Sequence, residues 1–310
     1  MKKLYFDKNL KNKKYLLGYF FALSATAIWS GNFIIARDLN TSIPPISLAF
    51  WRWTVAVIFL FPFAIKKLLA DWKTLKKNWI YISIVSLLGV TIFNTLIYLA
   101  GHTTTAINLS LISITFPVFI LLLSRIFYKE LITTHKAIGI LLVIVGVLFL
   151  ITKGNLSKLL NLSFSIGDIW MLLAAIIFAV YSILIKQKPT KLSLLGFQLS
   201  TFILGLLFML PFFIWETITV PPIKIESKTI FSILYVGIFA SLTAYILWNK
   251  AIEKIGPTKA GIVYYTLPLF SGLLAYFILN EAIGMVHFFS LVLILSGIVI
   301  ATYIKRKKID

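Results

Sequence analysis

The chain has 310 residues, of which 60% are hydrophobic, and its formal net charge at pH 7 is +20. Globular domains contain about 45–50% apolar residues, so a soluble protein of this composition could not cover its own surface. The absence of cysteine excludes thiol catalysis and cysteine-bound metals, and the three histidines are scattered along the chain. These features indicate an all-α integral membrane protein with no metal site and no cofactor.

Ten apolar segments follow one another along the chain. About 20 apolar residues cross the hydrocarbon core of a bilayer as a helix, and charge clusters and turn residues mark the breaks between such segments. A basic tail occupies residues 1–14, a second one occupies residues 305–310, and residues 152–166 form the longest connection. The predicted spans are Tyr15–Arg37, Ile46–Ile65, Trp79–Ala100, Thr105–Phe127, Lys136–Ile151, Gly167–Ile185, Leu192–Ile214, Thr229–Ala251, Pro257–Leu279 and Met285–Ile304.

The basic residues predict how these spans are oriented. Six lysines lie in residues 1–14 and five in Lys66–Asn78, and the other even-numbered gaps and the C-terminal tail are also rich in lysine and arginine. Cytoplasmic loops carry such an excess, so both termini are expected in the cytoplasm and residues 152–166 outside. The charges lie between apolar segments and not on one domain face, which argues against nucleic-acid binding.

The chain repeats itself. Pro117 and Glu130 reappear as Pro268 and Glu281, each 151 residues further on. Five spans precede the connection and five follow it, so the second copy enters the membrane from the opposite side. The sequence therefore predicts two inverted five-helix repeats, residues 15–151 and 167–304. Gene duplication alone would explain the repeat, but not the many polar residues kept within the spans.

Charges at the ends of the spans suggest two gates. Glu130 and Lys186 are predicted on the inner side, and Arg37 and Glu281 on the outer side. We expect a Glu130–Lys186 pair and a Glu281–Arg37 pair, each closing one side. The alternative is that each charge extends separately to headgroups and water.

Several short motifs resemble a known family. The first copy contains Ala27–Phe33, Phe50–Trp53, Pro117–Phe119 and Tyr128–Glu130; the second contains Gly167–Asp168, Ala179–Ser182, Gly237–Ser241, Pro268 and Asn280–Glu281. In order and spacing they resemble the EamA repeat of the drug/metabolite transporter superfamily, over residues 15–304. The resemblance implies a basket-like, ten-helix carrier in a bacterial plasma membrane. Carriers of this kind often export amino acids or related metabolites.

Polar and aromatic residues within the spans are the candidate substrate-binding residues, because polar groups inside a membrane are costly. Helical spacing places several of them on shared faces, and the repeat relates others. The set is Trp29, Asn32, Asn94, Tyr98, Ser110, Ser113, Tyr181, Trp248 and Tyr264. Aromatic walls with a few amides and hydroxyls suit a zwitterionic or amphipathic metabolite. The alternative is that these residues serve packing.

Arg52 is the most deeply placed charge, and the two prolines are candidate hinges. Arg52 lies seven residues after Pro45, about 10 Å along a helix. It either extends to the outer headgroups, binds a substrate carboxylate, or forms a structural ion pair. Pro117 and Pro268 each remove a helix hydrogen bond, so each is either a hinge or a passive kink.

The expected function is therefore transport of a small molecule by a monomer or homodimer in the lipid bilayer. No Asp or Glu lies in mid-span, which favours facilitated diffusion or exchange over proton coupling. A membrane enzyme is disfavoured, because no serine or aspartate stands next to a histidine within a span. Two alternatives stay open: import or exchange of a nucleotide-like metabolite, and lipid handling.

Overall fold

The computed structural model describes the backbone of most of the chain. The described residues are 2–38, 43–104, 109, 112–113, 115–160, 165–220, 226–279 and 284–302, without the side chains of 2–12, 33–38, 156, 158, 272, 275, 276, 278 and 279. Within these ranges each regular element is a helix. Ser110 and Glu281 and the side chain of Arg37 lie outside them, so the predicted Arg37–Glu281 pair does too.

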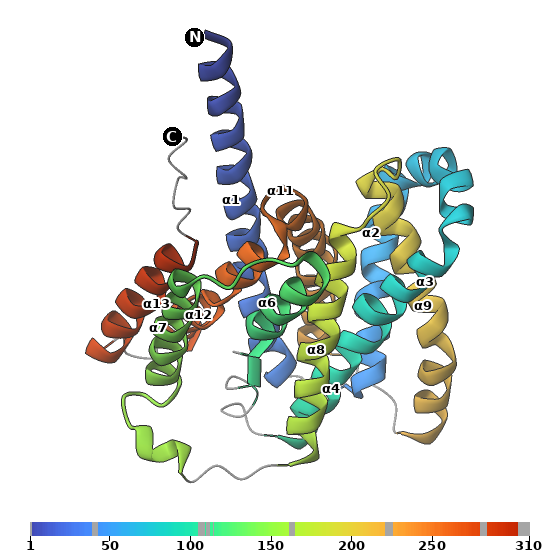
Figure 1. Cartoon of the computed structure of the whole chain (residues 1–310). Coiled ribbons are helices and arrows are strands. Elements are labelled where there is room, and N and C mark those ends of the chain that lie inside the picture. Colours follow the sequence, from blue (N-terminus) through green and yellow to red (C-terminus); the bar gives the residue numbers. More distant parts are fainter. Residues whose placement is uncertain are drawn as a thin grey trace.

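The helices form one bundle (Figure 1). The first half contains α1 Lys2–Asp38, α2 Pro45–Lys77, α3 Trp79–Ser86, η1 Leu87–Ile92, α4 Phe93–Thr103, α6 Thr115–Tyr128 and α7 Thr134–Ile151. The second contains η2 Leu156–Leu159, α8 Ile166–Lys186, α9 Leu194–Thr219, α10 Ser227–Tyr235, η3 Val236–Thr243, α11 Ala244–Tyr264, α12 Leu267–Leu279 and α13 Met285–Thr302. Seven helical stretches of the described chain are long and apolar enough to cross a membrane, and α6 is a shorter apolar helix.

Several predicted spans differ from the observed helices. The span predicted from Trp79 to Ala100 consists of α3, η1 and α4. The helix predicted to end at Ile65 continues as α2 to Lys77. The span predicted from Pro257 to Leu279 is divided, because α11 ends at Tyr264 and α12 begins at Leu267. The helical break predicted before Pro257 is a kink at Gly256, whose φ of 80° is open to glycine but strained for other residues.

The two prolines lie in α6 and α12. Pro117 is the third described residue of α6, and the helical residues 112 and 113 precede that helix; Pro268 is the second residue of α12. A proline in the first helical turn removes an N–H that has no partner within the helix, so Pro268 leaves the hydrogen bonds of α12 intact.

Each half also contains a π-helical stretch at a related place. η1 leads into α4 and η3 leads into α11, and Gly89 in η1 corresponds to Ala240 in η3 at the shift of 151 residues. Wider winding of this kind leaves a backbone carbonyl without its usual helical partner and is common at functional sites. In this protein the carbonyls of Gly89 and Ala240 both accept hydrogen bonds from side chains of the other half.

The contacts between helices follow the repeat. Helix α2 packs along its counterpart α9, and α7 packs along its counterpart α13. These pairs lie on opposite flanks of the bundle, with α1, α4, α6, α8 and α11 between them (Figure 1). The α7–α13 contact is close, because a Cβ atom on Gly139 would lie 2.5 Å from the carbonyl oxygen of Gly297.

Helices α2 and α9 stabilise each other's first turns. Glu216, near the end of α9 and 3% exposed, accepts hydrogen bonds from the backbone N–H groups of Ile46 (3.0 Å) and Ser47 at the start of α2. Asp71, near the end of α2, accepts from the N–H of Ser193 (2.9 Å), the residue before α9. Unpaired N–H groups at a helix start attract a carboxylate, so Glu216 caps α2 directly. Asp71 instead holds Ser193, whose hydroxyl caps α9 by accepting from the N–H of Gly196 (3.1 Å).

We predict that Glu216→Ala lowers the free energy of unfolding by about 2 kcal/mol, because two buried amides lose their acceptor. SDS titration of the purified protein would measure it. Glu226→Ala is the matched control: Glu226 also precedes a helix, α10, but it is exposed and makes no side-chain cap. Equal stability of both variants would contradict the assigned cap.

Candidate functional site

A buried arginine lies at the junction of the two halves. The side chain of Arg52 is 1% exposed. Its Nη1 donates to Asn94 Oδ1 (2.8 Å) and to the Tyr98 hydroxyl (2.6 Å), and its Nε donates to the Ser241 hydroxyl (2.6 Å). The ion pairs found among the described residues are made by Glu130, so the partners observed for Arg52 are neutral. Arg52 thus does not extend to the surface as a headgroup anchor would.

Further side chains extend this group into what we call the Arg52 network. Asn94 Nδ2 donates to the Tyr245 hydroxyl (2.9 Å), which donates to the carbonyl oxygen of Gly89 (2.7 Å). The Tyr98 hydroxyl donates to Asn32 Oδ1 (3.3 Å). The full network consists of Asn32, Arg52, Asn94, Tyr98, Ser241 and Tyr245, so the structure brings four of the predicted binding residues together.

A second polar group, the amide cluster, belongs to the second half. The Tyr181 hydroxyl donates to Asn249 Oδ1 (3.1 Å), and Asn249 Nδ2 donates to Gln198 Oε1 (2.8 Å). The 151-residue shift carries Tyr98 onto Asn249 and Asn94 onto Tyr245. The two polar groups are therefore built alike. In the Arg52 network, α2 supplies Arg52, which side chains of α4 bind. In the amide cluster, α9 supplies Gln198, which Asn249 of α11 binds.

The aromatic residues predicted as cavity walls pack against one another. The ring centroids of Trp29 and Trp248 are 5.3 Å apart, and those of Phe178 and Trp248 are also 5.3 Å apart. Tyr264 joins this cluster, with its ring centroid 6.1 Å from that of Trp248. The Trp29 indole donates to the carbonyl oxygen of Ala240 (2.9 Å). Each of these four aromatic residues is at most 6% exposed, so the cluster forms a packed centre.

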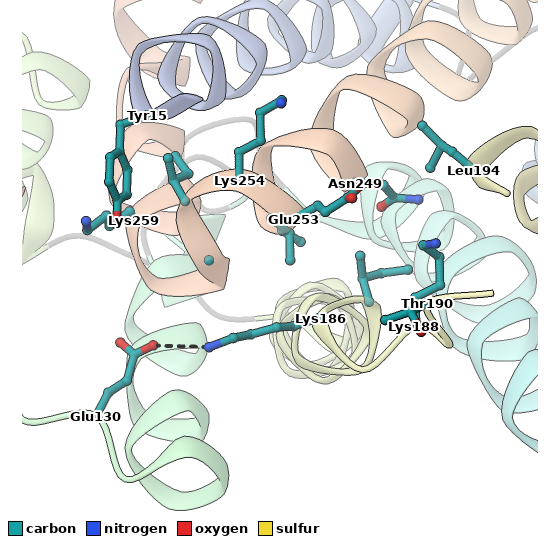
Figure 2. A pocket seen from close by; sticks show the side chains of 14 residues that line it. Tyr15, Glu130, Lys186, Lys188, Thr190, Leu194, Asn249, Glu253, Lys254 and Lys259 are labelled. Atoms are coloured by element: carbon teal, nitrogen blue, oxygen red, sulfur yellow. Dashed lines mark ion pairs between the residues drawn. The ribbon is translucent and has the colours of Figure 1, made fainter. Parts of the chain in front are cut away.

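A cavity of about 440 Å³ opens beyond this centre (Figure 2). Residues of both halves line it, and Asn249 of the amide cluster is one of them. Its charged lining residues are Glu130, Lys186, Lys188, Glu253, Lys254 and Lys259. None of the predicted substrate-binding residues lines it. Among the described residues no group of three His, Asp or Glu could hold a metal ion.

Glu130 connects four segments at the wall of the cavity. Its carboxylate oxygens lie 3.7 Å from the ammonium groups of Lys186, at the end of α8, and of Lys136, in α7. The Thr258 hydroxyl, two residues after the α11 kink at Gly256, donates to the same carboxylate (2.7 Å). The contact expected between Glu130 and Lys186 is therefore present (Figure 2).

Some functional candidates were missed from the sequence. Ser241, Tyr245, Gln198 and Asn249 were not among the predicted binding residues. The signal for two of them was available, because the shift of 151 residues that relates Pro117 to Pro268 also relates Asn94 to Tyr245 and Tyr98 to Asn249. The sequence interpretation instead matched Tyr98 with Trp248 at a shift of 150. Ser113 is buried, and Pro117 is buried in the first turn of α6.

Comparisons with known proteins define the class. The model of the EamA-like transporter family matches residues 16–152 and again residues 165–303. The chain thus belongs to the EamA-like transporter family, which confirms the resemblance seen in the sequence motifs. As a member it is a multi-pass membrane protein of a family of transporters.

Individual relatives agree with this assignment. An uncharacterized transporter of Archaeoglobus fulgidus is 29% identical over 255 residues, covering 82% of this chain and 86% of its own length. Uncharacterized transporter YyaM of Bacillus subtilis is 25% identical over 301 residues, with coverages of 94% and 96%. One solved crystal structure matches with a TM-score of 0.73 at 17% identity, covering 94% of this chain and 96% of the other, which shows the fold alone.

We predict that Tyr245→Phe lowers the free energy of unfolding by about 1–3 kcal/mol, because Asn94 and Gly89 lose a buried partner. Tyr265→Phe is the matched control. Tyr265 is 2% exposed, as Tyr245 is 1% exposed, but its hydroxyl has no hydrogen-bond partner in the described chain. Its removal should leave stability unchanged. Thermal unfolding in nanodiscs measures both, and equal shifts would contradict a structural role for the network.

Proposed function

We propose that this chain is a secondary carrier that moves a small metabolite across the bacterial plasma membrane by alternating access, and that amino acids or related compounds are exported. The observation that carries the proposal is the cavity shared by the two halves. Its volume of about 440 Å³ falls within the range of small-molecule sites. It reaches Asn249, the repeat counterpart of Tyr98 in the Arg52 network.

The arrangement of the helices supports an inverted repeat, which alternating access requires here. In Figure 1, α1 runs downward from the N-terminus, whereas its counterpart α8 runs upward from Ile166. The reciprocal caps of α2 and α9 support the same relation, because each start lies beside a late residue of the other helix. Ten spans with both termini in the cytoplasm belong to this proposal.

One observation favours a nucleotide-like metabolite as the second candidate. The cavity is lined by four lysines and two glutamates, an excess of positive charge that would attract phosphate groups. For such a substrate, the proposed activity would be import or exchange of the nucleotide-like metabolite and not export of amino acids. Lipid handling is the weaker candidate, because six charged side chains line the cavity and would face an acyl chain unfavourably.

Counterflow in liposomes tests the function. Purified protein is reconstituted, the vesicles are loaded with one unlabelled solute, and uptake of its labelled form is measured for amino acids, nucleosides and nucleotides in turn. We expect protein-dependent counterflow for amino acids. Counterflow of nucleotides alone would favour the second candidate, and no counterflow of any solute would contradict the carrier.

The same preparation tests the cavity and the orientation, because the chain has no cysteine of its own. Thr190→Cys places a thiol in the cavity, and Leu160→Cys places one in the exposed connection between the halves. We expect a charged, membrane-impermeant thiol reagent to modify the two from opposite sides of the vesicle. A transported solute should slow the reaction at position 190 only. Reaction of both from one side would contradict the inverted repeat.

Glu130 is proposed to act in gating, since its ion pairs join α6, α7 and α8 and its bond to Thr258 adds α11. We expect Glu130→Gln to change the rate of counterflow by about tenfold while binding of the solute is kept, because one conformation loses charge-assisted bonds. Glu253→Gln is the control, since Glu253 lines the same cavity but is exposed. A rate equal to wild type in both variants would refute the gate.

A further inference from the structure

Two buried hydrogen-bond donors beside each other lack an acceptor. The Nη2 atom of Arg52 and the indole Nε1 of Trp53 are both buried, and neither has a hydrogen-bond partner in the described chain. The guanidinium carbon of Arg52 lies 5.4 Å from the ring centroid of Trp53. Buried donors in native proteins almost always have a hydrogen-bond acceptor. Two neighbouring donors without one therefore point to an acceptor that the protein does not itself supply.

The charge of Arg52 indicates that this acceptor is an anion. Taking a guanidinium out of water costs several kcal/mol unless a counter-charge and hydrogen bonds compensate for it. The hydrogen bonds from Nε and Nη1 reach Ser241, Asn94 and Tyr98, which are neutral. Among the described residues, the carboxylate found in ion pairs is that of Glu130, and it binds Lys136 and Lys186 instead of Arg52. The hydrogen bonds around Arg52 are thus largely made, while its positive charge has no partner among the described residues.

The residues around Arg52 favour an anion with a single negative charge. A single guanidinium with neutral neighbours balances one negative charge, whereas a phosphate dianion would leave an excess charge in an apolar site. Its unpaired Nη2 atom can donate a charge-assisted hydrogen bond to a carboxylate oxygen. The rings of Trp53 and Tyr98 lie 5.4 and 5.6 Å from the guanidinium carbon and make its surroundings largely apolar. A carboxylate therefore fits better than phosphate.

The position fits a substrate subsite. The Arg52 network joins α2 and α4 of the first half to η3 and α11 of the second. Tyr245 of the network and Asn249 at the cavity are four residues apart on α11, about one helical turn or 6 Å. A solute beside Asn249 in the cavity is thus about one turn away from Tyr245, which is connected to Arg52 through Asn94. In the conformation described here Arg52 itself is closed off, so the solute reaches it after a movement of the halves.

We propose that Arg52 Nη2, assisted by Trp53 Nε1, binds the single carboxylate of a small monoanionic or zwitterionic solute. This inference rests on the proposed carrier function and specifies its substrate class. The carboxylate neutralises the buried guanidinium and accepts the donors that lack a partner, and the neighbouring aromatic side chains contact the apolar part of the solute. Asn94, Tyr98 and Ser241 are positioning residues that hold the guanidinium in place.

Pairs of probes that differ in the carboxylate test the proposal on the wild-type protein. Calorimetry on the full chain in nanodiscs measures the Kd of leucine against leucinamide and of 3-phenylpropionate against 3-phenylpropionamide. We expect each amide to bind about 30-fold or more weakly than its carboxylate, because a buried charge then stays unpaired. Equal affinities within both pairs, or no binding of either carboxylate, would overturn the proposal. Tighter binding of inorganic phosphate or chloride than of both carboxylates would overturn it as well.

Variants locate the effect at Arg52. Arg52→Gln should abolish the preference for the carboxylate, and Arg52→Lys should retain only part of it, because lysine keeps the charge but not the planar fork. Tyr265→Phe, outside the Arg52 network, should bind as the wild type does. If Arg52→Gln binds carboxylates as tightly as the wild type, the subsite is wrong. If Arg52→Gln does not fold, the wild-type probe pairs still decide the question.

Failure of this inference can be told apart from failure of the carrier function. Counterflow that is equal for the carboxylates and their amides, and unchanged in Arg52→Gln, would leave the carrier standing and remove the subsite. Arg52-dependent binding of carboxylates without any counterflow would leave the subsite standing and remove the carrier.

Discussion

The structure depends on one constraint of the bilayer: backbone polar groups without a helical partner must find one inside the protein. Here the partner often comes from the other half. The carbonyl of Gly89 accepts from Tyr245, and that of Ala240 accepts from Trp29. The first amides of α2 bind Glu216. Further donations across the halves run from Tyr81, Thr91 and Tyr128 to the carbonyls of Leu184, Gly205 and Ile183. At both π-helical interruptions, η1 and η3, a side chain of the other half thus binds a backbone carbonyl.

The repeat is symmetric in construction and asymmetric in chemistry. Asn94 and Tyr98 on α4 correspond to Tyr245 and Asn249 on α11, so amide and hydroxyl exchange places. The first half places a cation against this pair, whereas the second half places the neutral Gln198 there. The polar group of the first half is therefore positively charged and that of the second half is uncharged. In the carrier that we propose, this difference would let the two similar halves bind different parts of one molecule.

Much of the architecture could be predicted from the sequence, because hydrophobic length and the repeated Pro117 and Pro268 are local signals. Apolar runs indicated the helices, and repeated motifs indicated the family. The helix interruptions could not be predicted in this way, because a π-helical turn such as η1 has the same apolar composition as its neighbours. The site was half predictable. Arg52 stood out by its depth, but Ser241 is one of many span serines, and only tertiary structure shows that it binds the guanidinium.

The exchange of caps between α2 and α9 bears on the order in which the chain is made. Synthesis proceeds from the N-terminus, so Asp71 is already present when the ribosome produces Ser193, and it can hold this cap residue as soon as α9 inserts. Helix α2 has to wait until Glu216 has been added before its first amides find their acceptor. The earlier half therefore remains an unfinished structure during translation, and it is the later half that completes it.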